Sequence, residues 1–289
     1  MALLVLLSVH LHSIAFGLMM TGSRARRLVV ALIGWTALAM PFYVRFEPWL
    51  PGITALMLVG VAVRLYDLAM EKEVLPAWRR VLHASVWIEM RRTPRIAPYF
   101  HRRSVGALVV FGGLAAAGIE LVFSTQVFLL RWIGGALAAY ASFSAFCALA
   151  MLLWSALGFA LPRLHDHPIK SRTIAEFWGE RWNRIVGAWL RTSCFMPLAR
   201  RRMPRLGLVA AFTVSTILHA YLAWAALDAR AALYWCVFFM LQIPLVFAER
   251  ALRVARWPPA LGRAWTIGVM FLASYFFVEP EIRFFDSLR

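Results

Sequence analysis

Long apolar runs alternate with short polar loops along this chain of 289 residues. Eight runs approach the ~20 residues that an α-helix needs to cross ~30 Å of hydrocarbon. They lie at about 1–20, 28–44, 52–70, 104–123, 132–160, 206–227, 231–249 and 264–278. No basic residue precedes the first run and no small-residue cleavage site follows it, so we expect a retained helix there. The pattern predicts an all-α integral membrane protein with about eight transmembrane helices in a single domain, residues 1–289.

Two polar stretches between these runs predict amphipathic helices at the cytoplasmic membrane surface. Residues 71–103 carry eight basic side chains with Trp78 and Trp87 interleaved, a composition typical of helices that lie on lipid. In residues 176–191, aromatic and aliphatic side chains recur at helical spacings and can share one apolar side. They are Phe177, Trp178, Trp182, Ile185 and Trp189.

The chain is strongly basic, with 31 Lys and Arg residues against 14 Asp and Glu residues. A nucleic-acid-binding protein gathers such residues on a solvated face, but here they lie between apolar runs, and 62% of the chain is hydrophobic. We therefore expect contacts with membrane lipids and no nucleic-acid partner.

The distribution of charge predicts the orientation in the membrane. Loops after the first, third, fifth and seventh runs hold 25 of the 31 basic residues. By the positive-inside rule these loops face the cytoplasm, and both termini lie on the opposite side. Heavy use of Arg and Ala suggests a high-GC bacterium, so we predict a bacterial inner membrane.

Polar chemistry is concentrated in the second half of the chain. Residues 176–183 combine three aromatic rings, charges of both signs and an amide. His219 lies inside the run 206–227, where an ionisable side chain is costly and by default marks a functional site. Counted from Leu206 at ~1.5 Å per residue, His219 lies about 20 Å along a helix, past the middle of the hydrocarbon.

These residues resemble the membrane-bound O-acyltransferase superfamily, and more narrowly its wax-synthase-like branch. The match consists of a signature segment, residues 171–183, followed by a serine and a histidine in the sixth run. Its residues are Ser171, Glu176, Phe177, Trp178, Gly179, Arg181, Trp182, Asn183, Ser215 and His219. Thr216 and Ala220 depart from the pattern of that branch around the histidine. The resemblance implies an acyltransferase with the multi-spanning fold of that superfamily.

The resemblance also implies a reaction. An acyl group would pass from acyl-CoA, a co-substrate used without a further cofactor, to a hydroxyl group of a lipophilic acceptor. A long-chain alcohol, giving a wax ester, is the nearest acceptor, while a sterol-like, polyketide or glycan acceptor stays open.

Acyl transfer needs a base for the alcohol proton and hydrogen-bond donors for the developing oxyanion. The resemblance implies that His219 is the base and that Asn183 orients the thioester or stabilises the oxyanion. Arg181 is a candidate contact for a CoA phosphate, because guanidinium binds phosphate well. The side chains expected to shape the substrate site are Phe177, Trp178, Glu180, Arg181, Trp182 and Ser215.

Two non-enzymatic classes stay open. A transporter would spread polar residues over several spans, whereas the interior polar groups here are chiefly Arg64, Asp67 and His219. A haem-binding electron carrier would pair His219 with His10 or His12.

Other polar groups predict structural roles. Arg64 and Asp67 are three residues apart, share one helical face and predict an ion pair. His165, Asp166 and His167 are consecutive, so we expect a solvated turn there. The three cysteines have no metal-ligand spacing, and we therefore expect no metal site.

Overall fold

The structure is a computed structural model that describes residues 1–288, and all of its regular elements in this range are helices. The described residues form two compact units. One comprises Met1–Thr93 and Tyr221–Ala229 together with Leu288, and the other comprises Pro94–Ala220 and Arg230–Ser287. The prediction of an all-α integral membrane protein is confirmed, whereas the single domain stays a prediction.

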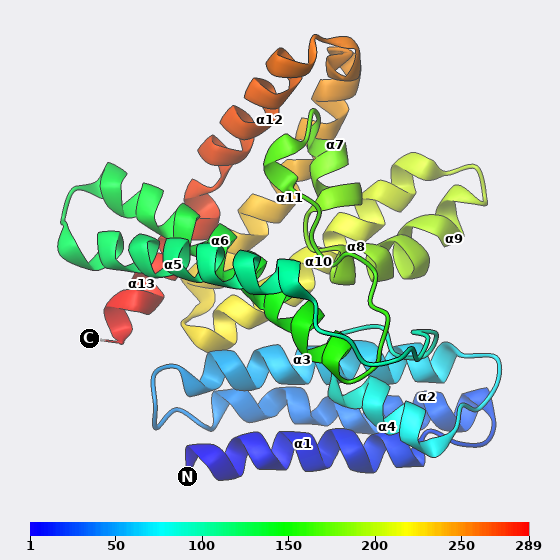
Figure 1. Cartoon of the computed structure of the whole chain (residues 1–289). Coiled ribbons are helices and arrows are strands. Elements are labelled where there is room, and N and C mark those ends of the chain that lie inside the picture. The colour runs from blue at the N-terminus through cyan, green and yellow to red at the C-terminus, as the bar shows by residue number, and fades with distance from the viewer. Residues whose placement is uncertain (289) are drawn as a thin grey trace. The chain divides into compact units, whose positions relative to one another are not determined.

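The first unit is built on α3, the most buried of its long helices (Figure 1). Its elements are α1 (Ala2–Met19), α2 (Arg24–Trp35), the 3-10 helix η1 (Thr36–Phe42), α3 (Leu50–Met70) and α4 (Ala77–Ser85). Val61, Leu65 and Leu68 of α3 pack in one apolar core with Met20 and Val30. Lipid tails are as apolar as these side chains, so close van der Waals packing between the helices holds the group together.

Buried arginines in this unit bind the carbonyl ends of helices. Arg80 of α4 is only 8% exposed and donates hydrogen bonds to the carbonyls of Gly17 and Leu18 at the end of α1. Arg27 donates to the carbonyl of Glu71, directly after α3. The last carbonyls of a helix lack intrahelical partners and favour a cation. These two arginines therefore stabilise helix ends. The cationic side chain of Arg80 on α4 thus contacts protein, in a stretch whose composition predicts contacts with lipid.

The second unit contains the remaining helices and the signature segment (Figure 1). The longer elements are α5 (Arg102–Ser124), α6 (Phe128–Ala156), α10 (Pro204–Ala226), α11 (Ala229–Ala251), α12 (Pro259–Ala273) and α13 (Tyr275–Ser287), with the last residues of α10 counted in the first unit. The shorter ones are η2 (Pro168–Lys170), α7 (Ile174–Glu176), η3 (Phe177–Arg181), α8 (Arg184–Leu190), η4 (Arg191–Phe195), α9 (Met196–Ala199) and η5 (Val254–Arg256).

α5 and α6 form a tight antiparallel hairpin (Figure 1). A Cβ atom added at Gly118 would lie 2.7 Å from the backbone nitrogen of Ala138 and 2.7 Å from the carbonyl oxygen of Gly134. Only glycine permits this approach, which is how small residues let membrane helices pack closely.

The predicted number of spans agrees with the structure. Seven segments are long and apolar enough to cross a membrane, namely α1, α2 with η1, α3, α5, α6, α10 and α11. α12 and α13 pass the same test as a pair, with a bend of 48° between them, and together give an eighth. The eighth predicted run, 264–278, includes this bend at Ser274, where the hydroxyl bonds the carbonyl of Phe271.

Candidate active site

The signature segment is tied to α11 where it begins. The carboxylate of Glu249 accepts hydrogen bonds from the backbone nitrogens of Ile174, at 2.6 Å, and Ala175, at 2.8 Å. Thr173 caps the same turn by accepting from the backbone nitrogen of Glu176. Glu249 is 3% exposed, so its charge is held among protein groups and these bonds fix the start of the segment.

An ion pair inside the segment holds its next turn. Nε of Arg181 lies 2.6 Å from Oε1 of Glu176, and another guanidinium nitrogen donates to the carbonyl of Asp166. Oε2 of Glu176 accepts from the backbone nitrogen of Arg172. Arg181 therefore already serves the fold of the loop, and its role as a CoA phosphate contact stays a prediction.

The segment is not one continuous amphipathic helix. It passes from α7 into η3, a π-helical turn, and α8 begins only after Asn183. Asn183 has a φ of 39°, in the left-handed region, which interrupts the helix. The prediction that the aromatic rings share one apolar side is wrong, because the segment is π-helical only up to Arg181, with Trp178 against α11 and Trp182 against α6.

Trp182 belongs to an aromatic cluster. Its ring stacks on Phe143 at 5.2 Å and on Phe177 at 5.5 Å, and it meets His165 edge-on at 5.0 Å. Burial, with a smaller effect of the His167 charge, lowers the pKa of His165 to about 4. His165 is therefore a neutral packing group and not part of a fully solvated turn. Phe177 and Trp182 pack in this cluster, and their role in substrate binding stays a prediction.

Trp178 is the signature side chain that reaches α11. Its indole Nε1–H donates to Oε1 of Gln242 at 3.0 Å. Its ring lies against Phe238, at 6.1 Å between centroids, and Phe239, at 5.8 Å. Gln242 is completely buried.

His219 on α10 lies next to the same part of α11. Its ring centroid is 3.9 Å from that of Phe239 and 5.8 Å from that of Trp235. Its Nδ1 lies 2.8 Å from the carbonyl oxygen of Ser215, which can only accept a hydrogen bond, so Nδ1 carries the proton. The lone pair of a neutral imidazole is then on Nε2, which makes no hydrogen bond to any residue in the described range. The ring is thus in the tautomer that a general base needs.

Asn183 also has unused hydrogen-bonding capacity. Its Oδ1 accepts from the backbone nitrogen of Val186, at 3.3 Å, and so caps α8. Asparagine tolerates the left-handed conformation better than most residues. The amide nitrogen donates to no residue in the part of the chain that the structure describes, which leaves both N–H groups for an oxyanion or a carbonyl oxygen.

Ser215 and Glu180 are the remaining residues predicted to shape the substrate site. Ser215 is buried at 6% exposure, with its Oγ 3.4 Å from Nδ1 of His219. Glu180 is exposed at the end of η3. Their roles in substrate binding stay predictions.

The structure adds three residues of α11 that sequence reasoning missed: Phe239, Gln242 and Glu249. Phe239 touches both Trp178 and His219, while the other two hold the signature segment by hydrogen bonds. A signal was available for the polar pair, since Gln242 and Glu249 are seven residues apart on one face of an otherwise apolar run.

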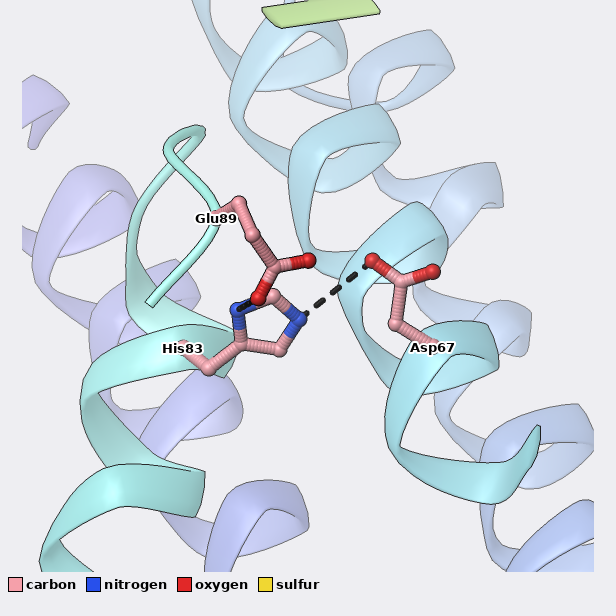
Figure 2. A group of neighbouring side chains, drawn as sticks. All are labelled: Asp67, His83 and Glu89. Atoms are coloured by element: carbon pink, nitrogen blue, oxygen red, sulfur yellow. Dashed lines mark ion pairs between the residues drawn. The ribbon is translucent and has the colours of Figure 1, made fainter. Parts of the chain in front are cut away.

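A second polar cluster lies in the first unit and has the composition of a metal site. Figure 2 shows Asp67, His83 and Glu89, whose ligand atoms lie within 4.8 Å of one another. However, Nδ1 of His83 already accepts the backbone N–H of Met90, at 3.1 Å, so the proton of the neutral ring is on Nε2. That nitrogen faces Oδ2 of Asp67 at 3.3 Å. Neither ring nitrogen of His83 has a free lone pair for a metal.

Arginines neutralise the carboxylates of this cluster. Arg64 pairs with Asp67 at 2.9 Å, which confirms the predicted ion pair, and Arg91 pairs with Glu89 at 2.6 Å. Burial alone would raise the pKa of Glu89, but the hydrogen bond from Arg91 and the charge of Arg91 hold it below its usual value. We interpret the cluster as a closed structural ion network.

The family comparison falls on the second unit. Residues 161–241 match the family described as "Membrane bound O-acyl transferase family". The resemblance read from the sequence is confirmed. The matched range contains the signature segment, His219 and Phe239, and it ends just before Gln242.

Two curated relatives illustrate the similarity. The chain is 31% identical over 154 residues to "Probable long-chain-alcohol O-fatty-acyltransferase 3" of Arabidopsis thaliana, which covers 48% of this chain and 45% of the relative. It is 30% identical over 151 residues to "Probable long-chain-alcohol O-fatty-acyltransferase 7" of the same plant, covering 47% and 44%. The matched part of the chain thus spans less than half of each relative.

Proposed function

We propose that this protein is a membrane-bound O-acyltransferase that moves an acyl group from acyl-CoA to the hydroxyl group of a lipophilic acceptor. A long-chain alcohol is the first candidate acceptor, because the names of the curated relatives specify that class. The product would then be a wax ester.

The observation that carries the proposal is the free Nε2 lone pair of His219. It lies inside the range that matches the acyltransferase family, on a helix long enough to span a membrane. Counted from Pro204 at ~1.5 Å per residue, His219 is about 22 Å along α10. A base at this depth can meet an alcohol dissolved in the bilayer.

The proposed chemistry uses two side chains. Nε2 of His219 takes the proton of the alcohol as its oxygen attacks the thioester carbon. The N–H groups of Asn183 stabilise the oxyanion of the tetrahedral intermediate. The carbon–sulfur bond then breaks, the proton on His219 passes to the leaving thiolate, and ester and free CoA are released.

Exposed arginines support a phosphate-bearing donor. A basic run at the start of α10 makes no ion pair with any residue in the described range, in contrast to Arg181. It comprises Arg200, Arg201, Arg202 and Arg205. Three phosphate groups of CoA would neutralise such a run, and guanidinium binds phosphate in bidentate geometry. By the positive-inside rule this run faces the cytoplasm, where we place the donor.

A product assay tests the proposal. Purified protein is supplied with a labelled long-chain acyl-CoA and, in separate reactions, a long-chain alcohol, a sterol or no acceptor. We expect mass spectrometry to identify an ester whose formation needs both protein and alcohol and matches the CoA released. Absence of any acyl ester with every acceptor, in protein that is shown to be folded, would contradict the proposed function.

A further inference from the structure

Four buried side chains form one stripe along α11. Phe239, Gln242, Val246 and Glu249 follow the helical spacing of three and four residues, and each is at most 3% exposed. Phe239 lies against His219, Gln242 bonds Trp178, and Glu249 binds the first backbone nitrogens of the signature segment. The stripe connects both parts of the candidate active site through a single rigid helix.

The orientation of the Gln242 amide is determined by its partners. The indole N–H of Trp178 can only donate and therefore faces Oε1, at 3.0 Å. The carbonyl of Phe238 can only accept and therefore faces Nε2, also at 3.0 Å. Oε1 and Nε2 each bind a protein group, and the side chain is completely buried, so Gln242 is enclosed by protein and acts through Trp178.

The position of Trp178 matters because of what it touches. Its ring packs on Phe239, and Phe239 packs on the imidazole of His219 at 3.9 Å. The hydrogen bond from Gln242 restricts rotation of the indole, since that bond would be lost without replacement among the surrounding phenylalanines. Gln242 therefore fixes the aromatic side chains that pack next to the imidazole.

We propose that Gln242 is a positioning residue for acyl transfer. It fixes the indole of Trp178, which packs on Phe239 and thereby fixes the position of the His219 ring. The inference rests on the proposed function and deepens it. Because Gln242 contacts no substrate in this scheme, its loss should lower kcat while leaving KM for both substrates nearly unchanged.

The test replaces Gln242 with leucine, which keeps the approximate volume and removes both hydrogen bonds. We expect kcat for ester formation to fall about tenfold, with KM for acyl-CoA and for the alcohol within about twofold of the parent. Gln126, the other glutamine of the chain, is exposed in the loop between α5 and α6, and Gln126→Leu is the matched control that keeps parental kcat.

The partner side chain supplies an independent arm if Gln242→Leu does not fold. Trp178→Phe keeps an aromatic ring against Phe239 and removes the indole N–H together with part of the ring, so it should lower kcat at least to a similar extent. The double variant should be no slower than the slower single variant, because both changes break one hydrogen bond.

The outcomes separate this inference from the proposed function. Parental kcat in both single variants, or strictly multiplied losses in the double variant, would overturn the positioning role while acyl transfer by the parent stands. A parent protein that forms no ester would instead overturn the proposed function itself.

Discussion

Each unit of this protein holds a histidine among charged or aromatic neighbours, His83 fully buried and His219 partly buried, and the two rings differ in whether a nitrogen lone pair stays free. Nδ1 of His83 accepts a backbone N–H, which uses its lone pair, and the protonated Nε2 faces Oδ2 of Asp67 at 3.3 Å. Nδ1 of His219 donates to a carbonyl, and its Nε2 has no partner in the described residues. The comparison teaches that an imidazole whose lone pair is bound by the backbone serves the fold, whereas a partly buried imidazole with a free lone pair can act as a base.

The largest effect should follow from removing the free nitrogen. His219→Ala deletes the proposed base, and such a deletion typically lowers a rate by about 10³-fold. We expect kcat for ester formation to fall by that amount, as measured with purified protein. An equally large loss of kcat in His83→Ala, measured at the same amount of folded protein, would contradict the assignment of a catalytic role to His219 and a structural role to His83.

The next largest effect concerns the amide of Asn183. Asn183→Asp keeps an oxygen to cap α8 and a side chain that tolerates the left-handed conformation, but it removes both N–H donors. Loss of one oxyanion donor costs about 10²-fold in kcat, which is the loss we expect here. Parental kcat in this variant would show that the amide nitrogen does not face the oxyanion.

In the first unit the expected effect is on stability. Asp67→Asn leaves Arg64 and Arg91 without the carboxylate that both face, and breaking a buried ion pair in this way costs about 3 kcal/mol. Thermal unfolding in detergent should show a lower Tm, while kcat per folded molecule stays within about twofold of the parent. A large loss of kcat at unchanged Tm would assign this network to catalysis.

The smallest effect should appear as a pH dependence of stability. The pKa of His165 is lowered to about 4 in the folded protein, against about 6.5 in an unfolded chain. The unfolded state therefore binds more protons below pH 6.5, so this part of the stability is complete above that pH and lost as the pH falls toward 4.

His165→Phe keeps a ring in the cluster and cannot titrate. Between pH 7 and pH 5, the Tm of the parent should fall by about 2–4 °C more than that of the variant. An equal fall in Tm for the two proteins would mean that protonation of His165 does not contribute to the pH dependence of stability.

The membrane spans, the candidate base and one ion pair could be predicted from the sequence, for physical reasons. Apolar runs long enough to cross a bilayer locate the spans, and the cost of burying an imidazole in such a run singled out His219. The Arg64–Asp67 pair follows from helical spacing within one element. Features that depend on one element alone can be predicted from its residues.

Features that depend on packing between elements could not be predicted. Gln242 and Glu249 are ordinary polar residues until α11 meets the signature segment and supplies their donors. The contacts of Trp178 with α11 and of Trp182 with α6 depend on the π-helical turn between them, which the α-helical periodicity of the sequence does not indicate. Similarly, Arg80 belongs to a basic stretch whose sequence predicts contacts with lipid, but its guanidinium binds the carbonyl end of α1.

Selective modification of the histidines tests the central claim most directly. Diethyl pyrocarbonate acylates an imidazole nitrogen that has an available lone pair, and mass spectrometry of peptides gives the rate at each histidine in the folded protein. We predict that His219 reacts, that ester formation is lost at the same rate, and that His83 stays unmodified. Modification of His83 as fast as His219, or full activity after His219 has reacted, would contradict the account.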